Sequence, residues 1–288
     1  MKRPAVNRFA EHTSFLVRVI ASADARLKTR IATFTNSQTK VTDRTLRSND
    51  PIQRDLQDQF RRWTQPYFYD CKDGEWDSLP TEHRQAFHVL GKTYRRISNV
   101  DAAKAYIAFH GKPIEAESNP KSIWDLSPQG LYNFVFPNER SAEELLLPFL
   151  IGEKFTTEIE ALVVRLGPSA TGDSAVVRDY LVHADTTLMA LAGYVIGRWR
   201  PAISRDTLRT LISRSSEIGT NIFERCNSAL KYEVLRARTE AEEADQLFNP
   251  RNFFLRTVVF QNAKNKIESD IDLLTEAEYF RRCGLTET

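Results

Sequence analysis

The spacing of apolar residues changes character part-way along this chain. After Asp101, apolar side chains recur every three or four residues, which is the period of an α-helix with one buried face. Such helices bury their apolar faces only by packing on other elements, so we expect a large, mainly helical region here. The predicted helical stretches are 102–109, 131–136, 142–150, 155–166, 174–196, 204–236 and 252–274.

The residues before this region mix helical and strand patterns. The run at 15–20, FLVRVI, favours a buried strand, and residues 25–34 have helical spacing. Asp50-Pro51 predicts the start of a helix that continues to about Trp63. Asp73-Gly74, which lies between two aromatic segments, predicts a β-hairpin with Lys72 at its tip.

These patterns together predict an α+β fold. A small mixed α/β unit would occupy residues 1–97, and a larger, mainly helical region would occupy residues 98–288. With 41% hydrophobic residues in a chain of 288, there is enough apolar material for one large domain or two modest ones without disulfide bonds.

Composition also narrows the class of protein. The longest apolar stretches are far shorter than the roughly 20 residues of a membrane span, so no membrane partner is expected. The N-terminus has no signal-peptide pattern, and Cys71, Cys226 and Cys283 lack metal-ligand spacing. We therefore predict a cytoplasmic protein. The histidines and glycines form no zinc or phosphate-loop motif, so no cofactor is expected.

Charge gives only a local argument for nucleic acid, because the net charge of the chain is +2. One stretch after residue 197 is rich in arginine, and Arg205 and Arg209 are spaced to share one helix face. Such a face binds phosphate in some proteins and is merely solvated in many others. The weaker binding candidates are Arg198, Arg200, Arg205 and Arg209.

Two short polar runs flank the loop that precedes the Asp50-Pro51 helix. Their amides, hydroxyls and guanidinium groups suit contacts with a base edge, a ribose or a phosphate. The same residue types also form helix caps and turns, so both interpretations remain open. The candidate residues for binding nucleic acid or a nucleotide are Asn36, Ser37, Gln38, Arg47, Ser48, Asn49, Asp50 and Gln53.

The same runs carry a resemblance to a known family. The segment 30–41 contains Asn-Ser-Gln after a predicted helix, and residues 46–50 read Leu-Arg-Ser-Asn-Asp. The aromatic segment 67–76, the AYIAFHGKP stretch and the aromatic run 122–136 follow in order. Over residues 13–150 this pattern resembles the AIPR family, the abortive-infection phage-resistance proteins of bacteria. The resemblance implies an antiviral defence protein that recognises nucleic acid, DNA included, or a nucleotide, with Arg47 as the phosphate contact.

The sequence also departs from the family pattern. Thr39 stands where Asn often follows Asn-Ser-Gln, and the Asn-Asn-Gly and Ile-Val-Asn-Gly-x-Gln-Thr motifs of the family's N-terminal part are missing. The resemblance is therefore to the C-terminal half alone, and it implies a chain that is not a complete enzyme by itself.

Two alternative functions follow from these departures. In the first, the chain is a non-catalytic interaction subunit that completes a split defence protein with a neighbour-encoded partner. In the second, it is a metal-dependent nuclease in which Asp70 and Lys72 hold a divalent metal ion and activate water. A divalent metal is the expected cofactor only in that second case.

Overall fold

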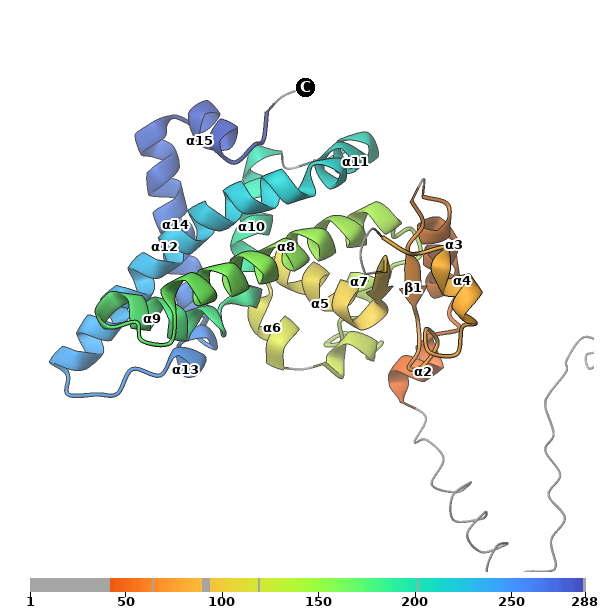
Figure 1. Cartoon of the computed structure of the whole chain (residues 1–288), viewed down its shortest axis with the longest axis horizontal. Helices are drawn as coiled ribbons and strands as arrows, with labels where there is room; N and C mark the ends of the chain where they lie inside the picture. Colours follow the sequence, from red (N-terminus) through yellow and green to blue (C-terminus); the bar gives the residue numbers. More distant parts are fainter. Residues whose placement is uncertain (1–41, 64, 90–93, 119, 201, 287–288) are drawn as a thin grey trace, which may run out of the picture. The chain divides into compact units, whose positions relative to one another are not determined.

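The computed structural model describes residues 42–286 except 64, 90–93, 119 and 201 (Figure 1). Residues 43–288 form one compact unit, in which helices dominate and the described strands make a single two-stranded sheet. The predicted strand at 15–20 and helix at 25–34 lie outside the described residues, as do Asn36, Ser37 and Gln38.

The unit begins with short elements around one longer helix. Helix α3 confirms the predicted start at Asp50-Pro51, since Pro51 is its first residue and its fixed φ suits the first turn. Ile52, Leu56 and Phe60 form the buried face of α3. The elements of this part are α2 (Asp43–Arg47), α3 (Pro51–Arg61), β1 (Phe68–Asp70), α4 (Thr81–Gln85) and β2 (Arg96–Ser98).

The predicted β-hairpin is wrong. Strand β1 pairs in parallel with β2, with Phe68 opposite Arg96, and a parallel pair needs a long crossover connection. Gly74, at φ +74°, does supply a tight turn, but the described residues directly after it form no strand that pairs with β1. Trp76 instead packs edge-on against Phe68, with ring centroids 5.1 Å apart. Aromatic burial, and not strand pairing, determines the path of this segment.

Helix α5 (Asn99–Phe109) follows β2 directly. The Ser98 hydroxyl caps it by accepting a hydrogen bond from the Asp101 N–H, at 3.0 Å. The chain leaves the helix at Gly111, whose φ of +79° favours glycine, as the sequence predicted. Three short helices come next: α6 (Pro113–Ser118), η2 (Ser122–Trp124) and α7 (Tyr132–Val135).

Some predicted helices merge and others divide. Stretches 142–150 and 155–166 form one helix, α8, which starts with a capping box between Ser141 and Glu144. Stretch 174–196 divides into two helices, and the sequence pattern does not show the break because Leu181, Ala184 and Leu188 keep helical spacing across the turn between them. The elements are α8 (Ala142–Leu166), α9 (Gly172–Leu181), α10 (Asp185–Trp199), α11 (Arg205–Ser213), α12 (Ser215–Glu243), α13 (Pro250–Phe254), α14 (Thr257–Leu274) and α15 (Glu276–Arg282).

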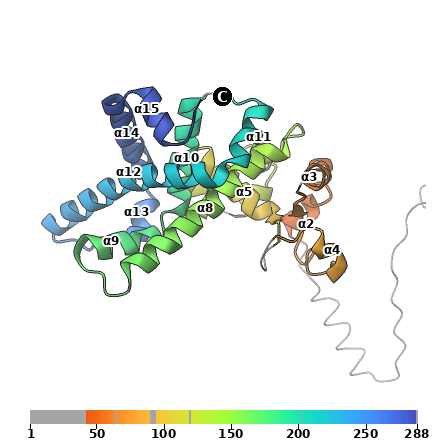
Figure 2. The same ribbon diagram turned by 45° about the horizontal axis from the view of Figure 1, so that its top comes forward.

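Helix α8 is the centre of the packing. It lies against α5, α10, α11 and α12, and α14 covers α12 and α10 (Figures 1 and 2). One apolar core continues from Phe60 and Ile97 through Leu146 to Ile222. The α+β prediction thus holds with a much larger helical share than expected, while the division near residue 97 stays a prediction. Within the described ranges, no helix is both long and apolar enough to cross a membrane.

A buried carboxylate joins α8 to α11. Glu143 is 2% exposed, and its two oxygens accept hydrogen bonds from Nε and Nη2 of Arg205, at 2.8 and 3.0 Å. Nε of Arg209 donates to the same carboxylate at 3.0 Å. Burial alone would raise the pKa of Glu143, but the two arginines outweigh it and hold the pKa below its usual value. This group stabilises the folded state while it is ionised.

Removing both arginines should destabilise the fold. The double substitution Arg205→Ala with Arg209→Ala leaves the Glu143 carboxylate buried without partners, which should lower the free energy of unfolding by about 2–4 kcal/mol. Urea denaturation at pH 7 measures this. Arg281→Ala, which removes an exposed pair with Glu278, is the control and should cost no more than about 1 kcal/mol. Equal losses in the two variants would contradict the assignment.

The same group should make stability depend on pH. Because the folded pKa of Glu143 is lowered, its contribution is complete above the ordinary glutamate pKa of about 4.3 and is lost as pH falls through the folded value. Glu143→Gln should therefore reduce the loss of stability between pH 5 and pH 3, a range set by that ordinary pKa of about 4.3. An unchanged pH profile would show that another carboxylate is responsible.

Candidate functional site

Gln53 is the centre of a buried polar network. Its side chain is fully buried, and its Oε1 atom accepts hydrogen bonds from the Tyr69 hydroxyl at 3.0 Å and the Asn99 amide at 3.4 Å. The Asn99 amide also donates to the Cys71 carbonyl, at 2.9 Å. Because these residues belong to α3, β1, the segment after β1 and α5, the network fixes how these elements meet.

Arg44 of α2 extends the network to the surface. Its Nε donates to Oδ1 of Asn99 at 2.8 Å, and its guanidinium pairs with the Asp73 carboxylate. The side chain of Arg44 is 13% exposed. Sequence reasoning missed both Arg44 and Asn99, since the contact joins residues 55 positions apart and no local pattern marks it.

The interior of the network is electrically neutral. Burial raises the pKa of the Tyr69 hydroxyl well above its usual value, so this group remains a donor at physiological pH. Burial, with the nearby carboxylates of Glu75 and Asp70, raises the pKa of the Cys71 thiol to about 12. Cys71 is therefore a protonated, packed thiol and not a nucleophile.

Arg47 and Asn49 lie at the exposed edge of this network. The side chain of Arg47 is 31% exposed, and its Nη1 lies 3.8 Å from Oδ2 of Asp50. Its guanidinium stacks over the Tyr132 ring, 5.8 Å from the centroid, and its Nε is buried without a hydrogen-bond partner in the described part of the chain. Asn49 is exposed, and its Oδ1 accepts a hydrogen bond from the exposed Arg54 at 2.8 Å.

Ser48 and Gln53 face inward in this corner, whereas Asp50 is partly exposed but already hydrogen-bonded. Ser48 is buried, and its hydroxyl donates to the Thr45 carbonyl at 2.7 Å. Asp50 accepts a hydrogen bond from the Tyr132 hydroxyl at 2.8 Å. The structure thus brings Arg47, Ser48, Asn49, Asp50 and Gln53 together, with Ser48 and Gln53 in the interior. Asn49 is exposed, and Arg47 and Asp50 are partly exposed, with 31% and 28% of their side chains accessible.

Tyr132 ties this corner to α7. Burial raises the pKa of its hydroxyl, and the hydrogen bond to Asp50 adds to the effect. The Gln53 amide and the Arg47 guanidinium act in the opposite direction. The Nε2 atom of Gln53 makes no hydrogen bond of normal geometry with any described residue, although its amide is close enough to influence Tyr132.

Asp70 and Lys72 have separate environments. Asp70 is 2% exposed, and its Oδ2 lies 2.5 Å from Nη2 of Arg96, so one carboxylate oxygen is already engaged. Lys72 is exposed in the turn after β1, where it lines a cavity of about 320 Å³ with Arg61 and Glu75. The residues that the structure describes include no cluster of three His, Cys, Asp or Glu side chains arranged to hold a metal ion.

Three of the four candidate arginines near α10 and α11 already have acidic partners. Arg205 and Arg209 bind Glu143, as described above. Arg198 lies 3.5 Å from Glu268, and it also pairs with Glu276. Arg200 stacks on Trp199, with its guanidinium 4.9 Å from the ring centroid, and among the described residues no carboxylate lies within ion-pair distance of it.

A comparison with models of protein families identifies the family of this chain. The family model described as "AIPR protein" matches residues 5–268. The chain belongs to the AIPR family. AIPR proteins are proteins of abortive-infection phage defence, and the match extends well past residue 150, so the helices from α8 to α13 and the first two thirds of α14 are part of the AIPR pattern. Neither the curated proteins nor the solved structures compared with the chain include a match.

The buried network of this AIPR protein should be essential for its stability. Gln53→Ala leaves the Tyr69 hydroxyl and an Asn99 N–H with one acceptor fewer and opens a small cavity, which should cost about 2–4 kcal/mol. Thermal and urea unfolding measure the loss. Gln65→Ala, which removes an exposed carboxamide, should change stability by less than about 0.5 kcal/mol. A tolerated Gln53→Ala would mean that water replaces the carboxamide and that the network does not hold the corner.

Proposed function

We propose that this AIPR protein acts in phage defence by recognising nucleic acid through the corner formed by α2 and the start of α3. Arg47 contacts phosphate there, and Asn49 supplies directional hydrogen bonds to a base or sugar. Asn36, Ser37 and Gln38 lie outside the described residues and remain binding candidates on the sequence alone.

The observation that carries this proposal is the exposure of Arg47 and Asn49 on a rigid base. The Arg47 guanidinium lies over Tyr132, and its Nη1 is 3.8 Å from Asp50, so its terminal N–H groups are the ones available for a phosphate oxygen, whereas its Nε is buried. The exposed Arg54, which holds Asn49, adds a second cation to the same surface. Because the buried network fixes this corner, a ligand would meet these groups already in place.

A second candidate function is docking of a protein partner at the same corner. Leu46, one residue before Arg47, is 57% exposed, and an exposed leucine at the centre of a polar surface is common where proteins associate. In this case the neighbour-encoded subunit, and not nucleic acid, would cover α2. Co-purification that Leu46→Glu abolishes, with DNA binding unchanged, would favour this function.

The double substitution Arg47→Ala with Asn49→Ala tests the first proposal. We expect binding of the full chain to single-stranded and duplex DNA, measured by fluorescence anisotropy, to weaken about tenfold or more, which corresponds to roughly 1–3 kcal/mol. The slope of the logarithm of affinity against the logarithm of salt concentration should become shallower by about one, the value for one lost phosphate contact. Protection of cells against phage should fall in parallel.

The matched control is Arg238→Ala with the exposed Gln129→Ala. It removes one cation and one polar side chain from α12 and from a loop, away from the corner. It should leave DNA binding and protection unchanged. Unchanged binding and protection in the Arg47 and Asn49 double variant, with a normal melting temperature, would overturn the assignment of the corner.

A further inference from the structure

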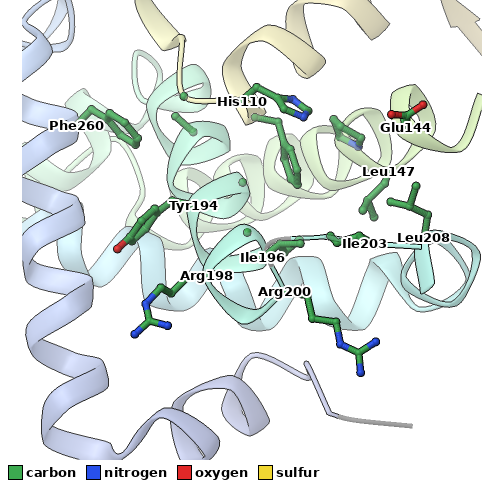
Figure 3. Close-up of a pocket in the computed structure, with 16 residues that line it drawn as sticks. His110, Glu144, Leu147, Tyr194, Ile196, Arg198, Arg200, Ile203, Leu208 and Phe260 are labelled. Carbon is green, nitrogen blue, oxygen red and sulfur yellow. The ribbon is translucent and has the colours of Figure 1, made fainter. Parts of the chain in front are cut away.

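A groove of about 630 Å³ lies among α5, α8, α10 and α14, with Leu208 of α11 at one end (Figure 3). Its wall is mostly apolar, with aromatic rings from Phe109, Tyr194 and Phe260 and aliphatic side chains such as Leu147. This volume and lining are typical of sites that bind small organic molecules. The groove is separate from the Arg47 corner, so an argument about it does not depend on the proposed function.

Gly197 leaves one part of the groove wall without a side chain. A Cβ added at Gly193, one turn earlier in α10, would lie 1.6 Å from the Phe109 carbonyl oxygen, so close helix packing explains that glycine. A Cβ added at Gly197 would meet no atom within 4 Å. Glycine inside a helix costs about 1 kcal/mol relative to alanine, and packing gives no reason for this cost at Gly197. The missing side chain at Gly197 leaves this part of the groove open.

His110 offers a fixed hydrogen-bonding group at the groove. Its Nδ1 lies 2.8 Å from the Tyr106 carbonyl oxygen, which accepts only, so Nδ1 carries the proton and Nε2 is an acceptor. The ring stacks on Tyr106 with centroids 3.9 Å apart. Desolvation by this packing lowers the pKa of His110 even though part of the ring is exposed, and the neutral ring is favoured at pH 7.

The charges around the groove favour an anion. Arg140 neutralises the Glu144 carboxylate in the wall at 2.8 Å, whereas Arg198 pairs with both Glu268 and Glu276, a group with one negative charge in excess. Arg200 has no acidic partner among the described residues and stands at the same edge as Arg198 (Figure 3). Just outside the lining, the Lys264 ammonium lies 4.6 Å from the centroid of the Tyr194 ring. The three cations Arg198, Arg200 and Lys264 outnumber the two carboxylates Glu268 and Glu276, so these groups together carry a net positive charge of one.

We propose that this groove binds a small organic anion with an apolar or aromatic body. The body packs against Tyr194, Phe260 and the open wall at Gly197, a donor group on it meets Nε2 of His110, and the anionic group lies at the edge beside Arg200. A nucleoside monophosphate and an amphiphilic hydroxycarboxylate share this chemistry, since each has a donor, an apolar or aromatic body and an anionic group.

Two fluorescent probes of nearly the same shape test the proposal. 8-Anilinonaphthalene-1-sulfonate carries an anionic group, and N-phenyl-1-naphthylamine lacks it. The full chain should bind the sulfonate saturably with one site, and more tightly than the neutral probe. Gly197→Leu should fill the groove and weaken sulfonate binding at least tenfold, whereas Gly197→Ala should retain it and melt at the same or a higher temperature. Arg200→Gln should abolish the preference for the charged probe.

Displacement of the bound sulfonate then identifies the source of the anion. Displacement by adenosine monophosphate and not by 10-hydroxydecanoate supports a nucleotide, and the reverse supports an amphiphilic hydroxycarboxylate. Equal affinity of the two probes for the unmodified chain, sulfonate binding that Gly197→Leu leaves intact, or failure of both competitors at millimolar concentration would overturn the proposal. Circular dichroism of each variant excludes unfolding as the cause of a loss.

Discussion

The carboxamide of Gln53 accepts hydrogen bonds from Tyr69 and Asn99, and this shared oxygen joins α3, β1 and α5 inside the protein. A buried carboxamide is costly unless its groups are paired, so the position of each of these elements depends on the others. Asn99 also accepts a hydrogen bond from Arg44, which ties α2 to the network, and α5 packs directly against α8. The accessible polar side chains of the corner are therefore held in place by elements that pack against the helical core.

This arrangement divides a set of residues that look alike in the sequence. Residues 47–53 include five polar candidates, and composition gives no reason to separate them. Burial separates Ser48 and Gln53, which lie inside, from the other three. Asp50 is about as exposed as Arg47 but accepts a hydrogen bond from the Tyr132 hydroxyl, and Asn49 is open to solvent. The partners that decide this are far away in the chain, so local sequence predicts the cluster but not the role of each member.

The same distinction applies to the fold. Features set by neighbouring residues were predicted well, such as the helix start at Pro51, the stop at Gly111 and most of the helices after residue 100. The pairing of β1 was predicted wrongly, because an Asp-Gly turn indicates a reversal of the chain but not which strand pairs with β1. The ion pairs of Glu143 with Arg205 and Arg209 were not predicted either, since a run of arginines is equally consistent with a phosphate site and with a set of ion pairs.

Hydrogen–deuterium exchange of the full chain, with and without bound DNA, tests most directly whether the α2 and α3 corner is the surface that recognises nucleic acid. Backbone amides that a ligand covers exchange more slowly, and local protection reports where the ligand lies. Our account predicts that DNA slows exchange in peptides covering residues 43–54, with little change in α9, α12 and α13. Protection confined to those C-terminal helices, with none at residues 43–54, would contradict it.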